Sequence, residues 1–87
     1  MKILALKDLI RKDVPIYYRR LYTGVASLEL RNNSGDYRID FAIEQKPTGQ
    51  KAITISFLDT VDYPLIPLTA KLKEHILALD QDGGLPE

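Results

Sequence analysis

The strongest constraint on this chain is an alternation of apolar and polar residues on both sides of a turn. Apolar residues occupy every second position over residues 37–43. That period of two is typical of a strand with one buried face. The same alternation recurs over residues 53–57, and the intervening segment 46–50 contains a proline and a glycine. The pattern therefore predicts a β-hairpin.

Two further strand-like segments precede this hairpin. The run Asn-Asn-Ser-Gly-Asp at residues 32–36 predicts a turn, because these residues tolerate positive φ or bond their own backbone. Before it, residues 26–31 alternate, and residues 16–22 are rich in aromatic side chains. Thr23-Gly24 separates these two pieces, as either a tight turn or a bulge in one long bent strand.

The period changes in the last third of the chain. One apolar stripe is spaced four, four and three residues apart, at Leu68, Leu72, Ile76 and Leu79. This spacing places all four side chains on one side of a helix. A glycine at position 83 suits a C-terminal cap. The segment therefore predicts a helix over residues 66–83.

The first fifteen residues form an N-terminal segment with two interpretations. Apolar positions in it fit a short amphipathic helix: Ile3, Leu6, Leu9 and Ile10. Val14-Pro15 would end that helix. A short strand over residues 3–6 is the alternative.

Together these elements predict a single α+β domain. An antiparallel sheet of three to four strands over residues 16–59 packs on the C-terminal helix, with a short N-terminal helix as an option, and 87 residues leave room for one domain. The sheet face expected against the helix carries Leu28, Leu30, Ile39, Phe41, Ile43, Ile53, Ile55 and Phe57. The opposite face, either solvated or a binding surface, carries Ser27, Glu29, Arg31, Arg38, Asp40, Ala42, Glu44, Thr54 and Ser56.

The composition argues against catalysis and cofactors. The chain has no cysteine and one histidine, His75. It therefore lacks thiolate nucleophiles, zinc–sulfur sites and multi-histidine metal sites. No glycine-rich phosphate-binding motif is present. We expect a protein that is not an enzyme and uses no cofactor or metal.

No segment suggests a membrane or secretion. The apolar run at residues 3–6 is too short for a signal-peptide core, and no stretch approaches the length of a transmembrane helix. The sequence predicts a cytoplasmic protein with no membrane partner.

A cluster of tyrosines and arginines is the most distinctive chemical feature. It comprises Tyr17, Arg19, Arg20 and Tyr22. A tyrosine ring stacks on nucleobases, and a guanidinium binds phosphate or stacks itself. The net charge is zero, but residues 1–31 carry seven basic and three acidic residues, and the remainder five and nine. Neutrality therefore excludes bulk coating of nucleic acid while allowing a local basic site.

The element order resembles the four-strand-and-helix unit of single-stranded nucleic-acid-binding proteins, namely the Pur-alpha repeat, the Whirly proteins and the positive-cofactor-type coactivators. The resemblance covers residues 16–82 and is carried by residues 36–44, the turn at 46–50 and the closing residues 72–76. It implies binding of single strands on a curved sheet and assembly into homodimers. By that resemblance the contact residues are Tyr17, Arg19, Arg20, Tyr22, Arg31 and Arg38.

Two hypotheses of function follow. The first is a small binding module for single-stranded DNA or RNA on the open sheet face. The second is a protein-interaction or structural homodimeric subunit with no nucleic-acid role. It is motivated by the polar sheet face and by the two charge poles of the chain.

Overall fold

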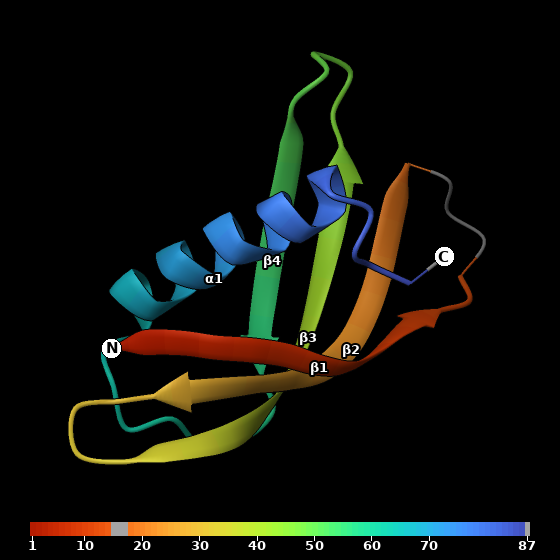
Figure 1. Cartoon of the computed structure of the whole chain (residues 1–87). Helices are drawn as coiled ribbons and strands as arrows, with labels where there is room; N and C mark the ends of the chain where they lie inside the picture. Colours follow the sequence, from red (N-terminus) through yellow and green to blue (C-terminus); the bar gives the residue numbers. More distant parts are fainter. Residues whose placement is uncertain (15–17, 87) are drawn as a thin grey trace.

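The computed structural model describes residues 1–14 and 18–86 and contains one sheet and one helix (Figure 1). The elements are β1 (Lys2–Lys12), β2 (Arg19–Glu29), β3 (Ser34–Gln45), β4 (Lys51–Phe57) and α1 (Leu65–Gln81). The strands form an antiparallel meander in the order β1-β2-β3-β4. The predicted α+β fold, with its antiparallel sheet and C-terminal helix, is confirmed.

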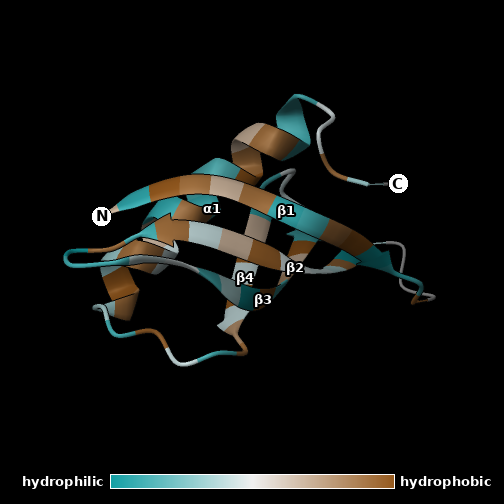
Figure 2. Cartoon of the chain, turned by 60° about the horizontal axis from the view of Figure 1, so that its bottom comes forward, coloured by the Kyte–Doolittle hydropathy of each residue, from teal (hydrophilic) through white to brown (hydrophobic). Residues whose placement is uncertain are grey.

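The core lies between α1 and one face of the sheet. Leu68, Leu72 and Ile76 of α1 are fully buried. They share one cluster with the apolar residues that β2 and β3 direct to the same side. Hydrophobic and hydrophilic residues alternate along the strands (Figure 2), and this alternation separates a helix-side face from an open face. The sheet face predicted to meet the helix is therefore confirmed.

The N-terminal segment is a strand, so the predicted helix is wrong and the alternative strand is longer than expected. The reason is that β1 is irregular. Its pairing with β2 shifts between Ile3 and Ala5, and again between Lys7 and Ile10. Each shift adds one residue and changes which side of the strand the next residue occupies. Apolar residues that share one face of β1 thus recur every third position, which imitates the spacing of a helix.

Thr23 and Gly24 lie inside one continuous strand, so the turn interpretation is wrong. Lys7 pairs with Val25 and Ile10 with Thr23, which leaves two residues of β1 opposite Gly24 alone. The extra residue of the bulge therefore belongs to β1 rather than to β2. Next to it, Asp8 has φ +53°, in the left-handed region that side chains other than glycine rarely adopt.

The glycine at position 24 makes room for Leu9 of the bulge. We expect Gly24→Ala to lower the free energy of unfolding by about 1 kcal/mol. A Cβ there would lie 2.5 Å from Leu9 Cδ2, so the leucine must rotate away. Urea unfolding of Gly24→Ala, Leu9→Ala and the double variant measures the coupling. The double variant should lose less than the sum of the single losses, and additive losses would contradict the contact.

The helix ends two residues earlier than the sequence predicted. Gly83 has φ +73°, and its N–H donates to the Asp80 carbonyl at 3.3 Å. The Gly84 N–H donates to the Leu79 carbonyl at 2.8 Å. This paired arrangement is the Schellman motif, which satisfies the last carbonyls of a helix. Leu85 then turns back and is buried against the core.

Candidate functional site

The predicted contact residues do not share one surface. Successive residues of β2 point to opposite faces of the sheet. Arg19 therefore lies on the open face, and Arg20 and Tyr22 lie on the helix side. Arg38 lies on the open face of β3, and Arg31 lies in the β2–β3 turn. Tyr17 lies outside the described residues. The Tyr/Arg cluster of the sequence is thus divided between the two faces.

Tyr22 belongs to the core. Its side chain has no exposed surface, and its ring stacks on Phe41 with centroids 5.0 Å apart and planes 17° apart. The ring has no face open to a nucleobase. The prediction that Tyr22 contacts nucleic acid is therefore wrong, because an aromatic residue in a half-buried strand gains more from packing in the core.

Arg20 is held in an ion-pair network beneath the end of α1. Its Nη1 lies 3.0 Å from Asp80 Oδ1, and Lys51 binds the other carboxylate oxygen. Arg20 also donates to the Tyr22 hydroxyl at 3.2 Å. The bond from Arg20 lowers the pKa of the Asp80 carboxyl, and the same bond raises the pKa of Arg20. Arg20 therefore ties β2 to α1 and is not available to a ligand.

Arg38 is engaged by Asp59 of the β4–α1 loop. Its Nη2 lies 2.6 Å from Oδ1, and its backbone N–H donates to Oδ2 at 2.8 Å. These bonds lower the pKa of the Asp59 carboxyl to about 2. A phosphate would have to displace this carboxylate before it could bind the guanidinium.

Two lysines of the open face are also paired. Lys7 lies 2.7 Å from Asp36, and Lys12 lies 3.1 Å from Asp40. The bond from Lys7 lowers the pKa of the Asp36 carboxyl. The open face therefore alternates positive and negative groups, which does not favour a long polyanion lying across it.

Arg19 is the exception on the open face. Its Nε is the one buried side-chain nitrogen or oxygen in residues 1–14 and 18–86 that lacks a hydrogen-bond partner. It borders a shallow hollow of about 150 Å³, whose floor includes Ala42 and Thr54 and whose rim includes Lys12. The hollow is too small for a base but matches the size of a single charged group.

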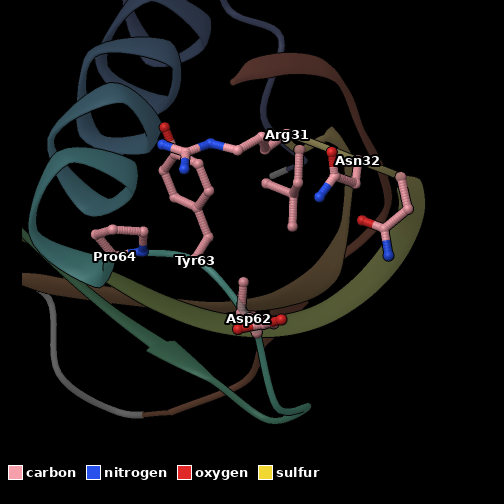
Figure 3. Close-up of a pocket in the computed structure, with 8 residues that line it drawn as sticks. Arg31, Asn32, Asp62, Tyr63 and Pro64 are labelled. Carbon is pink, nitrogen blue, oxygen red and sulfur yellow. The ribbon is translucent and has the colours of Figure 1, made fainter.

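Arg31 lies in a larger cleft between two loops at the other end of β2. The cleft has a volume of about 520 Å³. The β2–β3 turn contributes Leu30, Arg31, Asn32 and Asn33, and the β4–α1 loop contributes Val61, Asp62, Tyr63 and Pro64. Arg31 extends toward Tyr63 (Figure 3). Tyr63 is half-buried and packs against the core, whereas Arg31 is exposed and forms no ion pair with any described residue.

The sequence did not point to Tyr63 or Asp62 as partners of Arg31. The available signal was a loop over residues 59–64 that holds two acidic residues, a tyrosine and a proline. Polar loop residues of this kind carry binding functions more often than strand residues do. What the sequence lacks is the adjacency of this loop to the β2–β3 turn, about thirty positions earlier in the chain.

Nothing in the described ranges suggests a metal centre or a membrane span. No group of three histidine, cysteine or acidic side chains there could hold a metal ion. His75 is half-buried at the edge of a small surface pocket beside Met1. No helical segment in those ranges has the length and apolarity needed to cross a bilayer.

One comparison with known proteins places the chain in a family. A single family description matches residues 1–81, which covers all four strands and α1. No curated protein and no solved structure matches the chain. Because the family match extends over nearly the whole sequence, the chain belongs to the BB_0187 family.

Proposed function

We propose that the protein is a small binding module that holds single-stranded DNA or RNA in the cleft between the β2–β3 turn and the β4–α1 loop. One observation carries the proposal. Arg31, which has no ion pair among the described residues, extends toward the half-buried ring of Tyr63 in the largest of the clefts described above (Figure 3). The cleft volume also falls within the range of about 300–1,000 Å³ that is usual for ligand sites.

Tyr63 supplies a stacking surface for one base. Its ring packs on the core cluster from one side while it lines the cleft from the other. A ring held in this way loses little conformational freedom when a base stacks on it. Stacking of a base on an aromatic side chain contributes about 1–3 kcal/mol.

The polar residues of the cleft match the edge and the phosphate of an unpaired nucleotide. The Asp62 carboxylate accepts hydrogen bonds from exocyclic amino groups, and the amides of Asn32 and Asn33 both donate and accept. The Arg31 guanidinium binds a phosphate oxygen or stacks beside the base. In a duplex the base edges are paired and the rings are stacked on their neighbours, so this set favours single strands.

The charge of the cleft limits how strongly binding responds to salt. Arg31 is balanced by Asp62, so one or two phosphate contacts are expected rather than a basic track. For a single strand that number of contacts gives a weakening of about threefold to sevenfold between 50 and 200 mM salt. A protein that coats the strand would show a much steeper dependence.

Fluorescence anisotropy with labelled mixed-sequence oligonucleotides, single-stranded and duplex, tests this function. We expect the single strands to bind more tightly than the duplex, with the shallow salt dependence given above. Tyr63→Leu should weaken binding by about fivefold or more, which is the lower limit for loss of one stacked base, and Arg31→Ala should also weaken it. Arg11→Ala is the matched control, because it removes an arginine from the far end of β1.

Thermal unfolding of each variant separates lost binding from lost folding, because Tyr63 also packs on the core. Two results would refute the proposed function. One is the absence of binding to any single strand at tens of micromolar protein. The other is equal affinity of the wild type and folded Arg31→Ala.

A further inference from the structure

The two edges of the sheet differ in how well they are protected. β1 is one edge, and it carries both register shifts and several charged side chains: Lys2, Lys7, Asp8, Arg11 and Lys12. Bulges and edge charges are the features by which proteins prevent another strand from pairing. β4 is the other edge (Figure 1). It pairs with β3 without any register shift, and residues 52–58 contain no charge and no proline.

The hydrogen bonds next to β4 show which of its backbone groups face outward. The Leu58 N–H donates to the Arg38 carbonyl at 2.9 Å, and the Lys46 N–H donates to the Gln50 carbonyl at 2.8 Å. Bonded residues alternate along an antiparallel ladder. Even-numbered positions of β4 therefore bond to β3. Ile53, Ile55 and Phe57 direct their N–H and C=O groups to the free edge.

The sequence of β4 is nearly palindromic about Thr54. It reads Ala-Ile-Thr-Ile-Ser over residues 52–56. If two copies pair antiparallel with Thr54 opposite Thr54, all seven residues of β4 find a partner. Ile53 then faces Ile55 of the second copy on the helix side, and small side chains face each other on the open side. The outward backbone groups also fall on the positions that this register bonds.

We propose that β4 is the interface for a second copy of this chain, which pairs with it as a symmetric antiparallel strand. The near-palindrome favours this occupant, because an isologous contact requires a surface that complements itself. A β4–β1 contact is disfavoured, since β1 is bulged and charged. Association therefore stops at two copies and leaves a protected β1 at each end of the joined sheet. This inference stands independently of nucleic-acid binding.

The position of Thr54 gives a direct test by charge. Thr54 is exposed on the open face, so Thr54→Asp and Thr54→Lys leave the single subunit folded. In the proposed dimer the two Thr54 residues are a pair that is not hydrogen-bonded, with Cβ atoms about 4.5–5.5 Å apart. Two carboxylates or two ammonium groups at that separation repel each other. We expect each variant to weaken self-association at least about tenfold.

Analytical ultracentrifugation supplies the measurement. The wild type should sediment at twice the subunit mass of 9.9 kDa, and each charged variant as a monomer at the same concentration. An equimolar mixture of Thr54→Asp and Thr54→Lys should recover the dimer, because opposite charges then meet. Thr48→Asp, in the exposed β3–β4 turn, is the control that should remain dimeric.

Hydrogen exchange distinguishes this interface from any other. In the dimer the amides of Ile53 and Ile55 should be protected, and in Thr54→Asp they should exchange rapidly. The amides of Thr54 and Ser56 should stay protected in both, because they bond to β3. A wild type that is monomeric at several hundred micromolar would overturn the proposal. So would a Thr54→Asp variant that dimerises as tightly as the wild type.

Discussion

Replacing Ile76 by alanine is expected to lower the free energy of unfolding by about 2–5 kcal/mol. Ile76 lies on the buried side of α1 and has no exposed surface. The change removes apolar contacts with the sheet and leaves a cavity that the surrounding side chains fill only in part. In a domain of this size each kcal/mol corresponds to about 4–8 °C in Tm, so thermal unfolding should shift by about 10–30 °C.

The same helix offers a matched control. Ile66 is 87% exposed in the first turn of α1, so Ile66→Ala deletes the same atoms without opening a cavity. We expect it to change the free energy of unfolding by no more than about 0.5 kcal/mol. Chemical unfolding in urea measures both variants. Similar losses in the two would contradict the packing of α1 on the sheet described above.

Two neighbouring arginines are expected to respond in different ways to the same substitution. Arg20→Met should lower the free energy of unfolding by about 2 kcal/mol, because it leaves the Asp80 carboxylate with only Lys51 as a partner. Asp80 is 8% exposed and Arg20 is 29% exposed. Solvent at the arginine makes this loss smaller than that for a fully buried pair. Methionine keeps most of the apolar stem, so the effect reports the charge.

Arg19→Met is the control for that change. The Arg19 Nε is buried without a partner, and replacing such a group by an apolar one of similar shape is nearly neutral. We expect a change within about 0.5 kcal/mol in either direction. Urea unfolding at neutral pH compares the two variants. Equal losses at both positions would show that the Asp80 network does not stabilise the fold.

The elements that the sequence predicted well are those whose side chains keep one period. β3, β4 and α1 each repeat without interruption, so the buried faces of all three follow from the pattern alone. β1 was not predicted because its two bulges change the phase of the alternation, and that change depends on pairing with β2. Asp8 at positive φ gives no sign of the bulge, since glycine is the residue expected there.

The candidate site was predictable only in part. Arg31 was singled out from the sequence, and its side chain is exposed in the folded chain. Its proposed partner Tyr63 comes from a loop that the β2–β3 turn meets only in the folded chain. Arg38 was expected to be available, but Asp59, which is 21 positions away, occupies it. Such partners are set by strand register and loop path rather than by local pattern.

The sequence by itself determined the class of fold, the apolar face of β3 and β4, and the stripe of α1 that covers it. Periodicity is a local property, and hydrophobic burial follows it directly. Only the tertiary structure decided that Arg19 faces the open side while Arg20 meets Asp80, which is 60 positions away. Whether a charge is free or paired depends on contacts between distant segments, and those contacts exist only once the sheet has closed on the helix.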